Sequence, residues 1–341
     1  MADRVELAGW RLLSISFSCT LQFLACTATE SPASVPGECA DSERSSFVIL
    51  PDTQFYACGY PDIFESQTRW ISQSADSLGI ATVAHTGDVV DLNVDEQWAV
   101  AATALHQLDG RVPYVLAPGN HDIDVSRATK LDEYFGREDL DSGGCFEMGY
   151  MDDESIANAY LIVKLRGVSW LFLGLEFAPR DATLEWAAEV LGSHAEMPTV
   201  LFTHAYLYSR EQRYDRAVTP TQPYHPDAYA VTPEQGIADG QDIWNALVEP
   251  HGNVKLVLSG HVVPDGIERS VALRQSGSTV HEVLTNFQYC EVCPCEEALG
   301  GGGYLRVVTM DESGNQLQVR TYSPYLDAEL QDDENAFTLA L

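Results

Sequence analysis

The feature that most constrains the fold is a pattern that recurs five times: a short apolar run followed directly by a polar turn. The runs and their turns are 47–50 with 50–54, 80–84 with 87–91, 114–117 with 118–122, 199–202 with 202–204, and 254–258 with 259–263. Such runs, separated by helix-period segments, are typical of parallel strands buried on both faces. We therefore expect the turns to lie together at one end of a single sheet.

The turns carry side chains that ligate metals or move protons. In the third turn, Asn120 offers a neutral oxygen ligand, His121 a proton donor, and Asp122 a charge that anchors the turn. The other turns contribute Asp52, Gln54, Asp88, Asp91, His204 and His261. Oxygen and imidazole ligands gathered in one place outline a binuclear metal site.

In this order, the turns resemble the motifs of the calcineurin-like metallophosphoesterases. The family order is Asp-x-His, Gly-Asp-x-x-Asp, Gly-Asn-His-Asp/Glu, a lone His and Gly-His-x-His, and the likeness runs from about residue 47 to residue 324. Gln54 stands in place of the first His (Asp-x-Gln), and Val263 in place of the last (Gly-His-x-Val). The resemblance implies an α/β fold, a four-layer α-β-β-α sandwich of two mixed sheets.

The resemblance also implies roles for the matching residues. Asp88, which follows Gly87 at a strand end, is implied to bridge two metal ions, and Asn120, His204 and His261 to complete the first site. A carboxylate, an amide oxygen and two imidazoles suit zinc, manganese or iron. In the family, two ions clamp the phosphoryl oxygens and generate a hydroxide nucleophile near neutral pH.

The second site is implied to consist of Asp52 and Gln54 together with the bridging carboxylate. Because Val263 removes the last imidazole of the motif, we expect this site to bind its ion more weakly. Water, Asp265 or His281 are the candidates to fill the gap, and no motif supports any of them.

His121 and Asp91 are implied to act on the leaving group. In the family this His serves as an acid or charge stabiliser for the leaving oxygen, and Asp91 would orient it. The sequence therefore predicts a metallophosphoesterase that hydrolyses phosphate mono- or diesters. The alternative is a non-enzymatic cell-surface binding protein that keeps the fold with a degraded metal site, and the Val263 departure is the reason to retain it.

Charge and composition narrow the class of protein. The formal net charge is −32, from 51 acidic and 19 basic residues, which excludes a general binder of nucleic acids or anionic membranes.

With 341 residues and 45% hydrophobic content, the core suffices for one large domain, expected over 47–327. Within it, the tyrosine-rich insertion 206–241 is either a binding lid or a packed cap. Residues 328–341 are expected to form a C-terminal tail.

The N-terminal segment is typical of an exported chain. Residues 1–26 are expected to form a signal peptide, because an apolar run too short to span a membrane follows Arg4 and Arg11. Leu-Ala-Cys, ending at Cys26, resembles a bacterial lipoprotein processing site, with Cys26 as a possible lipid anchor to the membrane. Residues 27–46 then form a flexible tether. We expect the bacterial periplasm, an outer-membrane lipoprotein or the cell surface.

The cysteines agree with export. Apart from Cys19 and Cys26, six remain, an even number that predicts disulfides in an exported chain: 39, 58, 145, 290, 293 and 295. Zinc binding by the last three is the alternative, but no paired Cys or His motif completes a four-ligand site.

Helical spacing and flanking turn residues predict further elements. Residues 127–153 are expected to form an irregular surface excursion. We expect helices at 61–78, 95–108, 183–194 and 242–248, a hairpin at 160–165 and 170–175, and strands at 283–287, 304–310 and 317–322.

Overall fold

The computed structural model describes residues 44–140, 146–217, 222–263, 266–288 and 299–341. Two seven-stranded sheets form the centre of this described part. Sheet A has the order β15-β14-β13-β1-β2-β3, with β16 paired to β14. Strands β1, β2 and β3 pair in parallel, and all other pairs in this sheet are antiparallel. The strands are β1 (Ser46–Leu50), β2 (Ile80–His85), β3 (Tyr114–Leu116), β13 (Leu305–Met310), β14 (Gln316–Ser323), β15 (Ala328–Leu330) and β16 (Phe337–Ala340).

Sheet B has the order β11-β12-β10-β7-β6-β5-β4. Strands β6, β7, β10 and β12 run parallel, and β11, β5 and β4 join antiparallel at the two edges. Both sheets are therefore mixed. The strands are β4 (Glu147–Asp152), β5 (Ser155–Leu165), β6 (Val168–Leu175), β7 (Thr199–Thr203), β10 (Val254–Ser259), β11 (Ile267–Leu273) and β12 (Thr279–Thr285).

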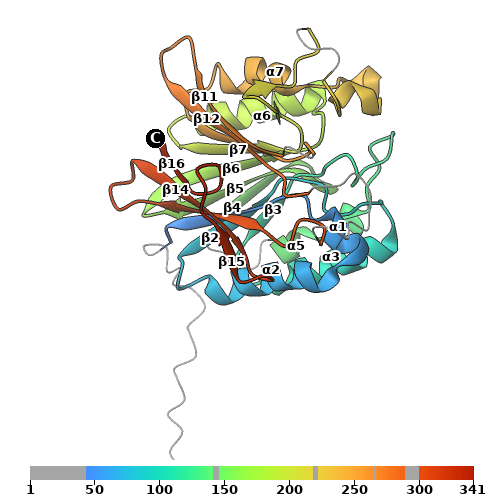
Figure 1. The fold of residues 1–341 in the computed structure, drawn as a ribbon. Coiled ribbons are helices and arrows are strands. Elements are labelled where there is room, and N and C mark those ends of the chain that lie inside the picture. The colour runs from blue at the N-terminus through green and yellow to red at the C-terminus, as the bar shows by residue number, and fades with distance from the viewer. Residues whose placement is uncertain (1–43, 141–145, 218–221, 264–265, 289–298) are drawn as a thin grey trace, which may run out of the picture. The chain divides into compact units, whose positions relative to one another are not determined.

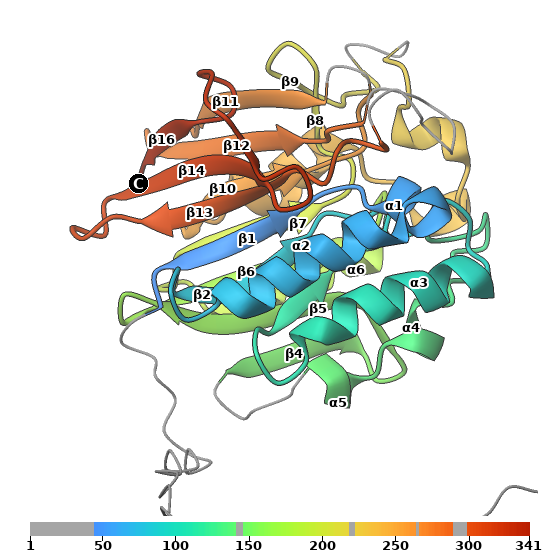
Figure 2. The ribbon, with the colours of Figure 1, turned by 60° about the horizontal axis from the view of Figure 1, so that its bottom comes forward.

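Helices cover the outer face of each sheet (Figures 1 and 2). On sheet A lie α2 (Pro61–Ser74) and α3 (Asp95–Leu105), and on sheet B lies α6 (Asp181–Ser193). The short helices are α1 (Gln54–Gly59), η1 (His106–Leu108), α4 (Leu131–Tyr134), α5 (Arg137–Leu140), α7 (Gly240–Ile243) and the π-helical turn η4 (Trp244–Val248). The predicted four-layer α-β-β-α sandwich is confirmed.

Alternation along the strands places apolar side chains on both faces of each sheet. On β1, Val48 and Leu50 pack towards the helices, whereas Phe47 and Ile49 pack between the two sheets. There Phe47 meets Phe172 of sheet B edge-to-face, with ring centroids 5.0 Å apart. A strand buried on both faces needs apolar residues at every position, which is why these runs are continuous in the sequence.

The expectation of a single sheet is wrong. The first three turns follow strands of sheet A, and the last two follow β7 and β10 of sheet B. The second sheet begins with β4 and the hairpin β5–β6, and β7 joins it because β7 pairs with β6 and not with any strand of sheet A. Turns from two stacked sheets therefore meet at one edge of the sandwich.

Two further expectations are wrong, because strand-period alternation in both segments was not recognised. The segment 328–341 is not a tail, because β15 and β16 pair with β14. The excursion 127–153 contains α4, α5 and β4, and β4 pairs with β5. Phe337 and Leu339, like Met148 and Tyr150, alternate at strand period and pack against the core. Acidic neighbours obscured that alternation in the sequence.

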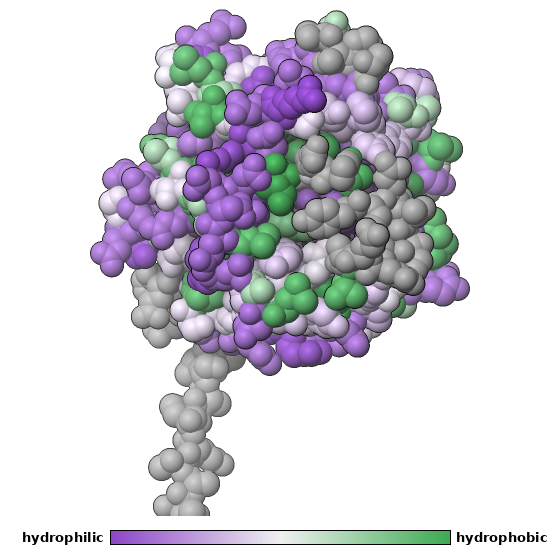
Figure 3. Space-filling view, viewed as in Figure 1, coloured by the Kyte–Doolittle hydropathy of each residue, from purple (hydrophilic) through white to green (hydrophobic). Residues whose placement is uncertain are grey.

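The predicted helices are present with shifted ends. α2 stops at Ser74, short of residue 78, and the helix expected at 95–108 continues beyond Leu105 as the 3-10 turn η1. Among the described residues, no helix is both long and apolar enough to cross a membrane. Hydrophilic side chains predominate on the face in Figure 3.

The predicted N-terminal segments 1–26 and 27–46 fall almost wholly outside the described residues, and so does Cys26. Of the six cysteines, Cys58 alone lies within the described residues, where it is disulfide-bonded. The pairing pattern of the six stays a prediction.

Candidate metal centre

Asp88 is placed by the sharp turn that follows β2. Gly87 and Asp88 both have positive φ, 101° and 50°, a conformation that glycine adopts without strain. Gly119 approaches so closely that a Cβ there would lie 2.1 Å from Asp88 Oδ1. The carboxylate is buried and accepts the backbone N–H of His121 at 3.0 Å. Only a glycine at 119 allows the turns after β2 and β3 to share this space.

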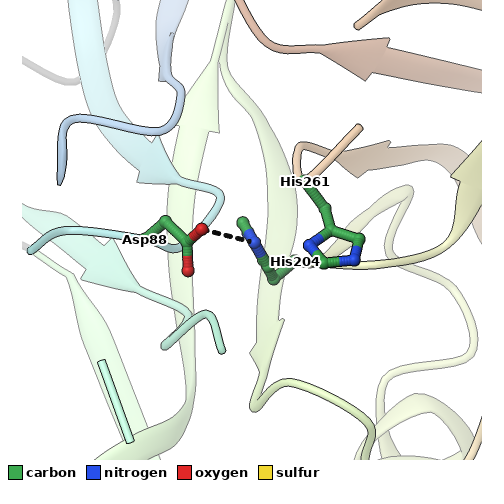
Figure 4. A group of neighbouring side chains, drawn as sticks. All are labelled: Asp88, His204 and His261. Atoms are coloured by element: carbon green, nitrogen blue, oxygen red, sulfur yellow. Dashed lines mark ion pairs between the residues drawn. The ribbon is translucent and has the colours of Figure 1, made fainter. Parts of the chain in front are cut away.

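His204, at the end of β7, faces Asp88 from sheet B. Its Nδ1 donates to the carbonyl of Thr86 at 2.9 Å, and its Nε2 lies 3.1 Å from Asp88 Oδ2 (Figure 4). Burial lowers the pKa of His204, but the Asp88 carboxylate raises it more, to about 9. The pKa of Asp88 is held well below its usual range, because His204 and His121 outweigh the opposing effect of burial. A proton or a metal ion between these two atoms satisfies both.

His261 completes a cluster in which the ligating atoms of Asp88, His204 and His261 all lie within 4.8 Å of one another. Its Nε2 donates to the carbonyl of Tyr224 at 2.7 Å, so that Nδ1 carries the free lone pair. Burial, reinforced by His204, lowers the pKa of His261 to about 3. The imidazole is therefore neutral, as a metal ligand must be.

Asn120 is the candidate for a fourth ligand atom, because its buried Oδ1 has no hydrogen-bond partner. Buried polar atoms are nearly always paired, so an unpaired oxygen in the turn beside Asp88 favours a cation at this place. One carboxylate, one amide oxygen and two imidazoles fit zinc, manganese or iron. We call Asp88, Asn120, His204 and His261 the histidine half of the centre.

Asp52 and Gln54 lie beside the histidine half. Asp52 Oδ1 accepts the backbone N–H of His261 at 3.0 Å, and Gln54 Nε2 donates to Asp88 Oδ2 at 3.0 Å. Burial, with a contribution from Asp88, raises the pKa of Asp52 to about 8. Val263 lines the same small pocket as Gln54, the position expected for the missing imidazole.

One of the two protein candidates for that gap, His281, lies away from the centre. Nε2 of His281 is bonded to the carbonyl of Ala340 at 2.5 Å, in the first half of β12 and away from the turns. The interpretation of His281 as a ligand is therefore wrong, because the strand β16 that covers it was not foreseen. Asp265 lies outside the described residues.

His121 is positioned by Asp91, through the backbone more than through the side chain. His121 Nδ1 donates to the Asp91 carbonyl oxygen at 2.7 Å, whereas the nearer carboxylate oxygen lies at 3.6 Å. Burial lowers the pKa of His121, but Asp88 and Asp91 together raise it above the usual value. Burial also raises the pKa of Asp91.

Asp122 anchors the turn, as predicted. Its buried carboxylate accepts three backbone N–H groups, from Gly119 at 2.7 Å, Val90 at 2.9 Å and Val89 at 3.1 Å. These bonds tie the turn after β3 to the turn after β2.

The sequence missed two amides beyond β12. Asn286 Nδ2 donates to Asp52 Oδ1 at 3.1 Å, and Gln288 donates its backbone N–H to Asn286 Oδ1 at 2.9 Å. Both are buried. A sixth apolar run followed by a polar turn could have indicated these residues. The strand expected at 283–287 extends through Phe287, which places Asn286 in the strand and not in the turn.

The insertion acts both as a packed cap and as a wall of the site. Tyr206 and Tyr214 are fully buried in the sheet B core. Tyr224 and Tyr229 instead line a pocket of about 80 Å³ over the centre, together with His121. The insertion contains β8 (Leu207–Tyr208), β9 (Gln212–Arg213), η2 (Pro226–Tyr229) and η3 (Pro233–Gln235).

Comparison with known proteins places the chain in a family. A family model described as calcineurin-like phosphoesterase matches residues 45–265, and the chain belongs to this family. The uncharacterized protein YvnB of Bacillus subtilis (strain 168) is 29% identical over 311 residues, which cover 87% of this chain and 22% of the relative. The chain thus spans about a fifth of that curated relative.

The chain is also similar to solved structures. The purple acid phosphatase PPD1 from yellow lupin (Lupinus luteus) seeds matches with a TM-score of 0.50 and 16% identity, over 87% of this chain and 53% of that one. GAP50, the anchor in the inner membrane complex of Plasmodium, matches with a TM-score of 0.45 and 10% identity, over 87% and 88% of the two chains. The chain thus combines the calcineurin-like phosphoesterase family and fold with a candidate metal cluster of Asp88, His204 and His261.

Proposed function

We propose that this protein hydrolyses phosphate mono- or diesters at the centre formed by Asp88, Asn120, His204 and His261. The observation that carries the proposal is the convergence of buried ligand atoms from two sheets, since the ligating atoms of Asp88, His204 and His261 all lie within 4.8 Å of one another. A bound transition metal there would supply Lewis acidity towards a phosphoryl oxygen and lower the pKa of a coordinated water.

The protein's own residues have distinct tasks in this proposal. Thr86 and Tyr224 accept the N–H groups of His204 and His261, which fixes the tautomer and ring orientation of each ligand. His121 lines the pocket and, because its pKa is raised, holds a proton at neutral pH more often than an ordinary histidine. With Nδ1 bonded to Asp91, it would deliver that proton from Nε2 to the leaving oxygen.

The pocket sets a limit on the substrate. Its lining includes three aromatic side chains, Phe55, Tyr224 and Tyr229, together with Asp88 and Asn120 of the centre. Because the volume is about 80 Å³, the pocket accommodates a phosphoryl group, and the rest of the ester would extend outward.

The test combines metal analysis with a phosphoester panel. The purified protein is expected to carry at least one transition-metal ion and to hydrolyse aryl phosphate mono- or diesters. Asp88→Asn and His204→Ala should lose both the ion and turnover while circular dichroism is unchanged. His194→Ala, a helix-end histidine bonded to Val190, is the matched control. Unchanged ion content and turnover in Asp88→Asn would refute the assignment.

A second candidate is a non-enzymatic binding protein with a degraded metal site. Val263 and Gln54 favour it, because both replace imidazoles of the family motif. A protein that binds one ion but fails to hydrolyse any member of the panel would support this alternative.

We also propose that the chain is exported to the periplasm, the outer membrane or the cell surface, with residues 1–26 as the signal and Cys26 as the lipidated residue. The sequence pattern supports this. Fractionation of bacteria that express the chain, with radiolabelled fatty acid, tests it, and Cys26→Ser should abolish labelling. Thiol titration of the denatured protein without reductant should find few free thiols, whereas mostly free thiols would contradict export.

A further inference from the structure

The half of the centre next to Asp52 has an unusual donor set. Two buried oxygens have no hydrogen-bond partner there: Oδ2 of Asp52 and Oε1 of Gln54. Both side chains are almost completely buried, with exposed fractions of 3% and 4%. Since a buried acceptor without a donor is costly, two of them beside the Asp88 carboxylate indicate a cation.

The residues around Asp52 leave its Oδ2 without a hydrogen-bond donor. Asn286 and the His261 backbone N–H both occupy Oδ1 of Asp52, which leaves Oδ2 without a donor. Gly260 provides the room, because a Cβ at this position would lie 2.2 Å from Oδ2. Asn286 is in turn held by Gln288, so the carboxylate has an oriented outer shell like that of metal ligands elsewhere.

The two halves of the centre differ in the ligand atoms that they offer. The histidine half offers two imidazoles, whereas the Asp52 side offers only oxygens, from Asp52, Gln54 and the shared Asp88. Val263 and Gln288 line the same pocket as Gln54 and bring no imidazole. Oxygen ligands suit hard cations such as Mg²⁺, Ca²⁺ and Mn²⁺, which retain several waters, whereas imidazole favours zinc and iron.

We propose that the centre is built for two different ions, with a transition metal in the histidine half and a hard divalent cation held by Asp52, Gln54 and Asp88. This inference rests on the proposed function, since it takes the histidine half as a metal site. If this holds, the replacement of two family imidazoles by Gln54 and Val263 changes which ion the second site prefers.

The test measures binding, not turnover. Chelator-treated protein is loaded with one equivalent of Zn²⁺, and the second ion is then followed by calorimetry and by metal analysis after equilibrium dialysis, with Mg²⁺, Ca²⁺, Mn²⁺ or further Zn²⁺. We expect a second ion to bind. Its preference for Zn²⁺ over Mn²⁺ should be at least about 100-fold smaller than that of the first ion, because imidazole is absent from its ligands.

Variants of Gln54 give opposite predictions. Gln54→Leu should weaken the second ion at least about tenfold, and Gln54→Glu should tighten Mn²⁺ by a similar factor, because a charged oxygen replaces a neutral one. Gln54→His combined with Val263→His should raise the affinity of the second Zn²⁺ at least about 100-fold. Gln318→Leu, on the exposed face of β14, is the matched amide control and should change neither ion. Unaltered first-ion affinity reports an intact fold.

The outcomes are distinguishable. Two Zn²⁺ ions bound with similar affinity and similar preference over Mn²⁺, or a second ion unaffected by Gln54→Leu, overturn the inference. A protein that binds one ion in the histidine half and never a second also overturns it, while the proposed function stands. If no ion binds even to the histidine half, the proposed function fails first and the inference fails with it.

Discussion

Replacing Asp122 is expected to cost more stability than almost any other single change at the edge of the sandwich. The carboxylate is fully buried and accepts three backbone N–H groups from two different turns. Asp122→Ala leaves all three donors buried without a partner. Since each unsatisfied buried donor costs about 1–3 kcal/mol, we expect a loss of at least about 3 kcal/mol in the free energy of unfolding.

Asp122→Asn should fall between the wild type and the alanine variant. The amide keeps one acceptor oxygen, which can still serve Gly119 and Val89, but its NH₂ group then faces the N–H of Val90. One donor is lost, at about 1–3 kcal/mol. Urea denaturation followed by circular dichroism gives both values, and metal analysis should show fewer bound ions in the alanine variant because Asn120 lies in the released turn.

Asp124 is the matched control. It accepts the backbone N–H groups of Ser126 and Ala128, but it lies exposed, where water replaces a lost partner. Asp124→Ala should therefore shift the denaturation midpoint far less. An Asp122→Ala protein within about 1 kcal/mol of wild type would refute the reasoning that three desolvated donors depend on this carboxylate.

Three further predictions follow from the same geometry. Because its pKa is raised to about 9, His204 is protonated in the metal-free protein at neutral pH. A metal ion that binds this imidazole must displace the proton. The apparent affinity for the first Zn²⁺ should therefore rise about tenfold per pH unit up to about pH 9. Calorimetry in buffers of different ionisation enthalpy should detect about one released proton, and a flat affinity between about pH 6 and 8 would contradict this. Gly260→Ala should displace the Asp52 carboxylate and weaken the second ion, whereas Gly192→Ala, with open space around its Cα, should not, as dialysis would show. Phe172→Ala, between the sheets, should cost about 3–5 kcal/mol in urea denaturation, and a loss below about 1 kcal/mol would contradict its place in the core.

The sequence alone determined the central strands and the long helices, and the chemistry carried by the strand ends. Strand, turn and helix signals are local, since alternation and turn residues act over a few positions. For that reason the local pattern suffices to place Asp88, Asn120 and His204 at strand ends. The family order of the motifs supplied the expectation of two stacked sheets.

The tertiary structure decided how those ends meet. The sequence could not show that His204 and His261 approach Asp88 from a second sheet, because sheet stacking depends on side chains far apart in the chain, such as Phe47 and Phe172.

Tertiary structure also decided which polar groups serve the centre and which do not. Asn286 reaches Asp52 across 234 positions of sequence, and the Tyr224 contact to His261 uses a backbone carbonyl that any residue could provide. His281 is removed from the site by β16, a strand whose alternation lay hidden among acidic residues. Local patterns predict which polar groups lie at each strand end. Which of these groups meet in one buried centre depends on packing between residues far apart in the sequence.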